Sequence, residues 1–302
     1  MTIIEALQWA NNKLKKVGVD SPMLDAELLL SEILGVSKAW LFSHFNDPLK
    51  IHQEEQFHLM VERRAAREPM GYILGKKDFY KRTFMVNPFV LIPRPATETL
   101  VEKALNIAGG SNLERTLLID IGTGSGAIAV TLAAETDFHV IAIDIDQKAL
   151  SVAKQNAEMH GVTNQIDFQH GNLLEPIIRL FTTLRRTNEQ HVSSIYPFDT
   201  LIITANLPYL KDEQMEKLQP EVTFEPTLAL EAGPDGMDAY HELFKQLKTH
   251  RRILPRTIHV LIEIDPDQDA RAMRVIHHHF PAANLETLKD LQGNKRVIVV
   301  KC

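Results

Sequence analysis

The stretch Leu117-Leu118-Ile119-Asp120-Ile121-Gly122-Thr123-Gly124-Ser125-Gly126 decides the fold. Its first residues predict a short strand over 117–120, and the apolar run 127–134 predicts the start of a helix. Glycines in such a strand-to-helix turn let the backbone approach a ligand closely, with the helix N-terminus behind it. The turn therefore predicts a cofactor site made by Asp120, Gly122, Thr123, Gly124, Ser125 and Gly126.

Asp144 narrows the choice of cofactor. It ends the next predicted strand, 140–143, and a carboxylate there can accept both hydroxyls of a ribose. This holds for nicotinamide cofactors and for S-adenosylmethionine alike. Because Gly122, Gly124 and Ala127 also satisfy the loose dinucleotide pattern, a dehydrogenase stays open on these residues alone.

Two further polar residues follow predicted strands. Asn172 comes after the strand 166–169, where a polar group would reach an adenine edge, and a plain turn residue is the alternative. Asp146 is expected to cap the helix 147–157.

Short apolar runs alternate with helical stretches from residue 116 onward. Runs at 117–120, 140–143, 201–205 and 259–264 predict a mainly parallel sheet covered by helices on both faces, and 296–301 is expected to pair antiparallel at the sheet edge. Residues 179–197 show neither period, and we interpret them as a loop or short helix. They also look like an insertion.

The first 70 residues predict a small helical domain. Apolar residues recur at helical spacing, and Ser21-Pro22 and Gly35 are start and stop signals for a helix over 23–34. A third helix is expected at about 52–67, followed by a strand over 78–86. We place the domains at 1–75 and 76–302, with 76–95 as a connector.

Composition excludes several classes of protein. The chain of 302 residues has 33 Lys plus Arg against 39 Asp plus Glu, so it is a poor match for a phosphate backbone. We expect the cluster Arg63, Arg64 and Arg67 to be a solvated helix face. No apolar run is long enough for a membrane span, and the first residues lack the features of a signal peptide. Cys302 is the single cysteine, which excludes an internal disulfide and a cysteine-based zinc site and suits the cytoplasm. We also expect a monomer and no metal site.

The strand 201–205 leads into Asn206-Leu207-Pro208-Tyr209. This tetrad resembles the signature of methyltransferases that act on planar nitrogens, which usually reads Asn-Pro-Pro-Tyr. An amide nitrogen is a poor nucleophile and must be held and aimed. The Asn206 side-chain oxygen and the Leu207 carbonyl can each accept one N–H of the target, Pro208 stiffens the loop, and Tyr209 can stack on the flat group. An ordinary turn is the alternative for these residues.

Across nearly the whole chain, the sequence is similar to the release factor N5-glutamine methyltransferases. Besides the glycine turn and the tetrad, the resemblance rests on 91–98 (LIPRPATE), on 225–236 and on 290–297 (DLQGNKRV). It implies a Rossmann-like class I methyltransferase domain after a helical domain that holds the protein substrate. It further implies S-adenosylmethionine as cofactor, the glutamine of a release factor Gly-Gly-Gln loop as target, and Pro93 and Arg94 beside the substrate.

Two residues depart from the family pattern. Ala96 stands where an acidic residue is usual, and Leu207 replaces the first proline of the tetrad. Asn-Leu-Pro-Tyr is also the form in ribosomal RNA adenine dimethyltransferases, so these remain an alternative, as does a ribosomal-protein glutamine methyltransferase. A cofactor-binding module that docks on release factors without catalysis is a third reading. The acidic net charge and the helical domain placed before the catalytic one favour a protein substrate.

Overall fold

The computed structural model describes residues 1–187 and 198–302, and it divides into two compact units. One unit comprises Met1–Lys76 together with Leu218–Phe224, and the other comprises Lys77–Lys217 together with Glu225–Cys302. The chain therefore passes between the units three times. No helix among the described residues is long and apolar enough to cross a membrane.

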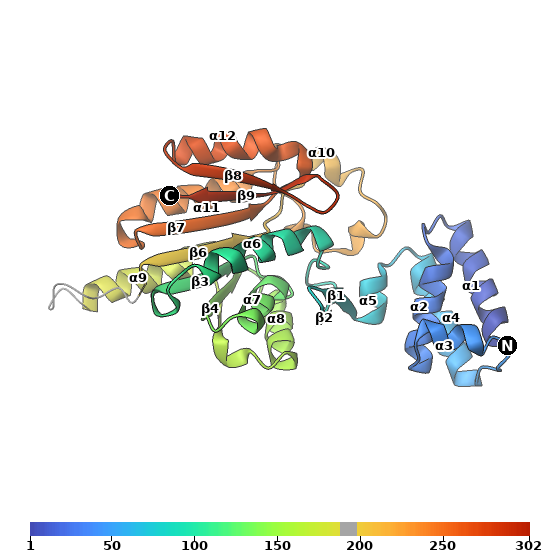
Figure 1. Ribbon diagram of the computed structural model, residues 1–302. Coiled ribbons are helices and arrows are strands. Elements are labelled where there is room, and N and C mark those ends of the chain that lie inside the picture. Colours follow the sequence, from blue (N-terminus) through green and yellow to red (C-terminus); the bar gives the residue numbers. More distant parts are fainter. Residues whose placement is uncertain (188–197) are drawn as a thin grey trace. The chain divides into compact units, whose positions relative to one another are not determined.

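The first unit is helical, as expected (Figure 1). Its helices are α1 (Ile3–Lys16), α2 (Pro22–Leu34), α3 (Lys38–Ser43), α4 (Ile51–Ala65) and α5 (Met70–Leu74). A capping box between Thr2 and Glu5 starts α1, and Gly35 ends α2 in the left-handed conformation, as its sequence predicts. Helix α4 ends two residues earlier than expected. Apolar side chains of α1, α2 and α4, among them Leu7, Leu29 and Phe57, form the core of this unit.

The prediction that Arg63, Arg64 and Arg67 form a solvated face holds for Arg63, which is exposed, and is wrong for Arg64 and Arg67. Arg64 is buried, and its guanidinium donates to Asp25 of α2 at 2.7 Å and to Glu221 at 2.8 Å. Arg67 binds both carboxylate oxygens of Glu221 at 2.7 Å. Because an acidic partner neutralises its charge, Arg64 can lie inside the unit. Arg64 and Arg67 fasten residues 218–224 to a part of the chain that lies more than 150 positions earlier.

The second unit is built on a seven-stranded sheet of order β5-β4-β3-β6-β7-β9-β8. Five strands are parallel: β3 (Thr116–Ile121), β4 (Val140–Asp144), β5 (Ile166–His170), β6 (Thr200–Ala205) and β7 (Thr257–Glu263). The strands β8 (Asn284–Lys289) and β9 (Lys295–Lys301) are antiparallel. The expected fold class is confirmed. The edge strand is β8, and β9 lies between β7 and β8.

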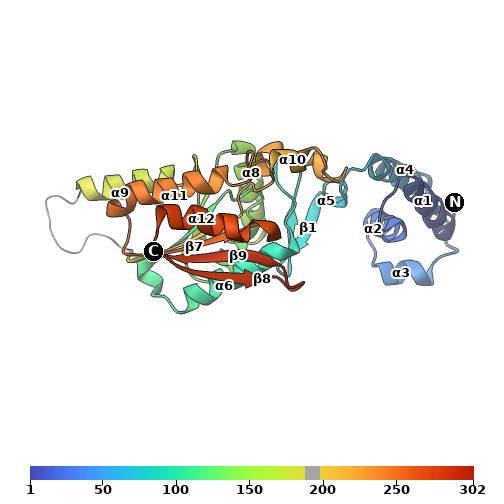
Figure 2. The same cartoon turned by 90° about the horizontal axis from the view of Figure 1, so that it is seen from above.

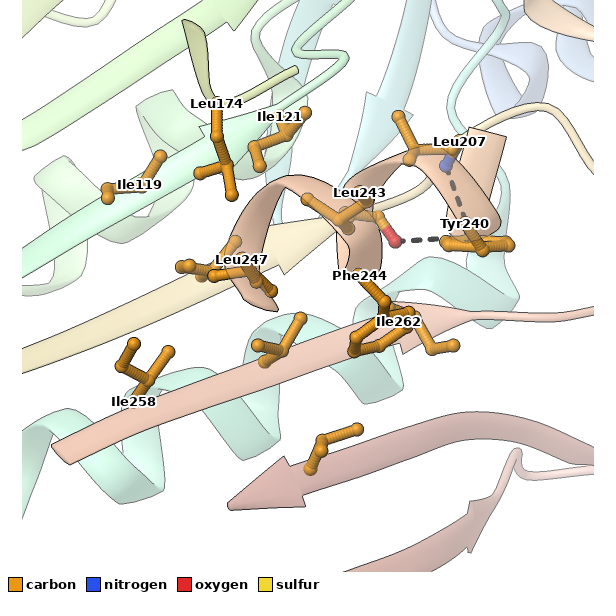
Figure 3. Packing of buried hydrophobic residues seen from close by; sticks show 14 of the residues in the cluster. Ile119, Ile121, Leu174, Leu207, Tyr240, Leu243, Phe244, Leu247, Ile258 and Ile262 are labelled. Carbon is orange, nitrogen blue, oxygen red and sulfur yellow. Dashed lines mark hydrogen bonds between the residues drawn. The ribbon is translucent and has the colours of Figure 1, made fainter. Parts of the chain in front are cut away.

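Helices cover both faces of this sheet (Figures 1 and 2). On one face lie α6 (Glu98–Gly109), α7 (Ala127–Glu135) and α8 (Gln147–Met159), which share a core with Leu118 of β3. On the other lie α9 (Glu175–Thr187), α11 (Asp238–His250) and α12 (Asp269–His279), packed against Leu117 and Ile119 (Figure 3). Both faces of β3 are thus buried, which explains why its sequence is continuously apolar rather than alternating.

Two local expectations need correction. The segment 78–86 is not one strand but a hairpin of β1 (Lys76–Phe79) and β2 (Arg82–Met85). Tyr80 and Lys81 turn the chain there, with φ of 46° and 61°. In the segment 179–197, helix α9 begins earlier, at Glu175, and runs to Thr187, whereas 188–197 lie outside the described residues. A short helix α10 (Asp212–Met215) follows the tetrad.

Candidate active site

The candidate site lies at the carboxyl ends of the central strands β3, β4 and β6. From β3 the chain continues to β4 and β5 on one side, whereas β6 and β7 add to the other side. This reversal leaves a crevice at the strand ends, where open α/β sheets bind their ligands. The glycine turn after β3, Asp144 at the end of β4 and Asn206 after β6 all meet there.

The glycine turn adopts a conformation that side chains would obstruct. Gly122, Gly124 and Gly126 have φ of 69°, 53° and 80°. A Cβ on Gly122 would lie 2.9 Å from Leu207 Cδ2, and one on Gly126 would lie 3.0 Å from Ala153 Cβ of α8. The turn therefore keeps its backbone exposed to the crevice and lets two helices pack closely behind it. It thus forms a cradle in which a ligand can approach the backbone closely.

Asp144 is tied into this cradle. Its Oδ2 accepts the Gly124 N–H at 2.8 Å and its Oδ1 accepts the Asp146 N–H at 2.9 Å. Burial raises the pKa of Asp144, whereas these backbone donors lower it. Each carboxylate oxygen has a second lone pair, so both ribose hydroxyls can still be bound. Asp146 caps α8 by accepting the Lys148 N–H, as expected.

A cavity of ≈ 230 Å³ joins most of the predicted residues. Of those predictions, its lining includes Pro93, Gly122, Thr123, Gly124, Ser125, Asp144, Asn172, Asn206, Leu207 and Pro208. Asp120, Gly126, Tyr209 and Arg94 do not line it. The cavity is also lined by apolar residues of two loops to which the sequence gave no role, including Phe89 and Val90 from one loop and Leu228 and Ala229 from the other.

Asp120 lies behind the glycine turn and is completely buried. It accepts hydrogen bonds from the hydroxyls of Thr123 at 2.7 Å and Thr204 at 2.9 Å. Burial raises the pKa of Asp120 to about 7, and these hydroxyls oppose the shift. Asp120 does not line the cavity, but its hydrogen bond to Thr123, which does, holds the turn in place from behind.

The tetrad presents one free acceptor beside the cavity. Asn206 Nδ2 donates to Thr97 Oγ1 at 3.3 Å, whereas buried Oδ1 has no hydrogen-bond partner among the described residues. A buried polar atom without a partner is costly, so it marks a site where a ligand completes the pairing. Tyr209 is fixed through its backbone oxygen, which accepts Gln268 Nε2 at 2.6 Å, and burial raises the pKa of its phenol.

Tyr240 supports the tetrad from α11 (Figure 3). Its hydroxyl accepts the Leu207 N–H at 3.2 Å and donates to the backbone oxygen of Glu263. Because proline has no N–H, this bond exists only where the first proline of the signature is replaced, as it is here. The hydrogen bond restrains the backbone at Leu207, where the usual signature has a proline ring that would restrain it.

A double-mutant cycle measures this restraint. Tyr240→Phe should lower stability by about 1 to 3 kcal/mol, because the Leu207 N–H and the Glu263 oxygen lose a buried partner. In a Leu207→Pro background the same change should lower stability less, since proline has no N–H that could lose its hydrogen-bond partner. Urea unfolding of the four proteins gives the coupling. Equal costs in both backgrounds would show that the hydrogen bond contributes nothing.

Arg94 joins the two walls of the cavity. Its guanidinium forms an ion pair with Glu225, whose carboxylate is 1% exposed and also accepts the Ile92 N–H at 3.2 Å. Burial raises the pKa of Glu225, and the Arg94 guanidinium acts in the opposite direction. The pair links residues 92–94 with the segment that supplies Leu228 and Ala229.

Thr97, Tyr240 and Glu225 are the site residues that the sequence did not assign. Thr97 and Glu225 lie within stretches that carry the family resemblance, but nothing in their local pattern indicates a partner. Tyr240 lies on a helix at an apolar position, where an aromatic ring is expected to be core. Its hydroxyl contacts become visible only when α11 packs on the sheet.

Known structures share the fold. The hMettl16 catalytic domain in complex with the MAT2A 3'UTR hairpin 1 superposes with a TM-score of 0.52, at 15% identity, covering 80% of each chain. The complex with hairpin 6 gives a TM-score of 0.51 at 15% identity, covering 72% of this chain and 74% of that one. At this identity the likeness extends to the fold alone.

Two families and several characterised proteins match the sequence. Residues 5–75 match the "PrmC N-terminal domain" and residues 114–273 match the "Methyltransferase domain". The release factor glutamine methyltransferase of Bacillus subtilis is 37% identical over 98% of this chain and 96% of its own. Those of Bacillus cereus and Dictyoglomus turgidum are each 33% identical, covering 99% and 98% of this chain and 98% and 97% of theirs. The chain therefore belongs to the release factor glutamine methyltransferase family of S-adenosylmethionine-dependent enzymes.

Proposed function

We propose that this protein transfers a methyl group from S-adenosylmethionine to the side-chain amide nitrogen N5 of the glutamine in the Gly-Gly-Gln motif of peptide-chain release factors. The observation that carries the proposal is the buried Asn206 Oδ1, which has no hydrogen-bond partner among the described residues and lies beside a cavity with a glycine cradle and the Asp144 carboxylate. This oxygen can accept an N–H of the substrate next to a site suited to S-adenosylmethionine.

The donor set fits the cofactor. Gly122 and Gly124 leave room for a ligand against the backbone, Asp144 has free lone pairs for ribose hydroxyls, and Asn172 lines the same cavity. Apolar walls around it keep water from the reacting atoms. When bound, S-adenosylmethionine supplies an electrophilic methyl group on a positively charged sulfur.

The tetrad holds the target nitrogen. The Asn206 Oδ1 accepts one N–H of the glutamine amide and the Leu207 carbonyl accepts the other, which leaves the lone pair to attack the methyl carbon. A carbon–nitrogen bond forms as the carbon–sulfur bond breaks, and the positive charge that develops on nitrogen is stabilised by the two oxygens. One proton then leaves the alkylated nitrogen for solvent. The step needs no strong base, and we assign none.

Methyl transfer to a purified release factor tests the proposal. Incubation with S-adenosylmethionine, followed by peptide mass mapping, should place one added methyl group on the glutamine of the Gly-Gly-Gln peptide. A release factor with that glutamine replaced by alanine is the matched control and should gain none. If the protein binds the cofactor but no peptide is methylated, the enzymatic proposal is wrong and the protein is a cofactor-binding module that docks on release factors without catalysis.

RNA adenine is the competing substrate for the same tetrad. Methylation of RNA, with binding that weakens steeply as salt rises, would move the assignment to nucleic acid. The acidic net charge of -6 favours the protein substrate instead. We also propose that the protein acts in the cytoplasm, where translation termination takes place.

A further inference from the structure

Asn156 is a buried polar residue of α8 to which the proposed reaction gives no role. It is 0% exposed, and its Oδ1 accepts the Met85 N–H at 2.7 Å. Its Nδ2 donates to the Met85 oxygen at 3.0 Å and to the Ser125 oxygen at 2.8 Å. Because both amide protons and the amide oxygen are paired, the orientation of this side chain is fixed. The three bonds join two backbone segments that lie 40 positions apart in the chain.

The two segments are separate parts of the cavity lining. Ser125 belongs to the glycine turn and lines the cavity itself. Met85 ends β2 and leads directly into the loop 86–93. The cavity residues that this loop supplies are Phe89, Val90, Leu91 and Pro93. Asn156 is therefore bound at once to the turn and to the residue at which the loop begins.

Helix α8 binds β2 at two positions, of which Asn156 is one. The other is His160, whose Nε2 lies 2.9 Å from the Thr83 backbone oxygen. Residues four apart on a helix share a face, and the backbone groups of residues two apart on a strand point to the same edge. Four helical residues rise about 6 Å and two strand residues about 7 Å, so the two spacings match. Of the two side chains, Asn156 is the one that also binds the glycine turn.

A second contact from α8 reaches the loop further along. Lys148 Nζ lies 4.6 Å from the centre of the Phe89 ring, and Asn87 Oδ1 accepts the Phe89 N–H at 3.0 Å. The Phe89 ring is 44% exposed, so water weakens its attraction to Lys148. The buried hydrogen bonds of Asn156 are the stronger connection between the helix and the loop.

We propose that Asn156 is a positioning residue for cofactor binding, which fixes the loop 86–93 against the glycine turn. The proposal rests on the placement of S-adenosylmethionine in this cavity and is independent of the methyl acceptor. Asn156 does not line the cavity and acts through Ser125 and Met85. A ligand that has to order two separate segments binds more weakly than one that finds them already in place, so the expected effect is on affinity.

Calorimetry of Asn156→Ala and His160→Ala with S-adenosylmethionine provides the first test. Asn156→Ala should weaken cofactor binding about tenfold, because the buried Ser125 oxygen and the backbone of Met85 lose their partner. Its cofactor KM should rise in parallel, whereas kcat at saturating cofactor and release factor should stay close to the wild-type value. His160→Ala is the matched control. It also removes a bond between α8 and β2 but leaves the glycine turn in place, so its cofactor affinity should be that of the wild type.

Hydrogen exchange without cofactor or release factor gives a readout that does not depend on activity. In Asn156→Ala the amides of 122–126 and of Met85 should both exchange faster than in the wild type. In His160→Ala the amides of 122–126 should exchange at the wild-type rate. The wild type alone provides a third measurement, which needs no variant to fold. Cofactor binding at the turn should slow exchange of the Met85 amide, although Met85 does not line the cavity.

Three outcomes would overturn the proposal. A folded Asn156→Ala with wild-type cofactor affinity would show that the three bonds do not prepare the site. Equal losses of affinity in Asn156→Ala and His160→Ala would show that any loosening of β2 has the same effect. An unchanged Met85 amide in the cofactor-bound wild type would show that the turn and the loop are not coupled. Because none of these measurements uses methylation of a release factor, they stand even if the proposed substrate is wrong.

Discussion

Asn206→Ala should lower kcat for methyl transfer by about 10² to 10³-fold, the range observed when one preorganised group that stabilises developing charge is removed. Its Oδ1 is a buried acceptor with no partner in the part of the chain that the structure describes, and the methyl side chain of alanine cannot hold the target N–H. The affinity for S-adenosylmethionine, measured by calorimetry, should stay nearly unchanged. The lost contact is with the substrate amide, and the cradle of Gly122 and Asp144 remains intact.

Asn172→Ala is the matched control for this variant. Asn172 lines the same cavity but follows β5, on the side of Asp144. We expect it to weaken S-adenosylmethionine binding while kcat at saturating cofactor stays close to that of the wild type. If Asn206→Ala loses cofactor affinity and rate together, Asn206 has been assigned to the wrong ligand.

The sheet and the cofactor turn could be predicted from the sequence because they follow from local patterns. The central parallel strands β3, β4 and β6 are buried on both faces, so each reads as a nearly continuous apolar run followed by loop residues. The turn after β3 needs glycine at Gly122, Gly124 and Gly126 because φ is positive at each of them. Such features depend on the local backbone, which leaves a pattern that is visible without a structure.

The arginine cluster of α4 and the residues around the tetrad could not be predicted in this way. Arg64 is buried because Glu221 and Asp25 come to it from distant parts of the chain. Thr97 meets Asn206 only because the start of α6 packs beside β6. Pairs of this kind leave no periodic pattern in either partner, so sequence reasoning assigned Arg64 and Arg67 to solvent and left Thr97 without a role.

The variant Arg94→Ala distinguishes two roles for Arg94. In one, Arg94 binds the substrate, as the sequence resemblance implies; in the other, it holds the walls of the cavity together. Arg94→Ala should lower the free energy of unfolding by about 2 kcal/mol, less than a fully buried pair would cost because the Arg94 side chain is partly exposed. The affinity for S-adenosylmethionine should fall as well, since the segment with Leu228 and Ala229 loses its ion pair to Arg94. Urea unfolding and calorimetry give both quantities.

The pH dependence of this loss has a defined sign. Without Arg94, the Glu225 carboxylate is left buried and uncompensated, so the folded-state pKa of Glu225 rises further above its unfolded value. Stability is then lost at pH values above the unfolded pKa, where the unfolded chain ionises this group and the folded chain resists it. Arg94→Ala should therefore be closest to the wild type in acid and fall furthest behind at neutral pH.

Glu225→Gln decides between the two roles of Arg94. A glutamine at this position keeps an oxygen for the Ile92 N–H and carries no charge to bury, so the double variant Arg94→Ala/Glu225→Gln should recover much of the stability and cofactor affinity that Arg94→Ala loses. Glu225→Gln alone leaves Arg94 in partial contact with water and should cost little. If Arg94 instead contacts the release factor, the double variant will have the same raised KM for the protein substrate as Arg94→Ala. Recovery of stability, cofactor affinity and KM together would assign Arg94 to the wall of the cavity, because a substrate contact cannot be restored by changing the residue that Arg94 neutralises.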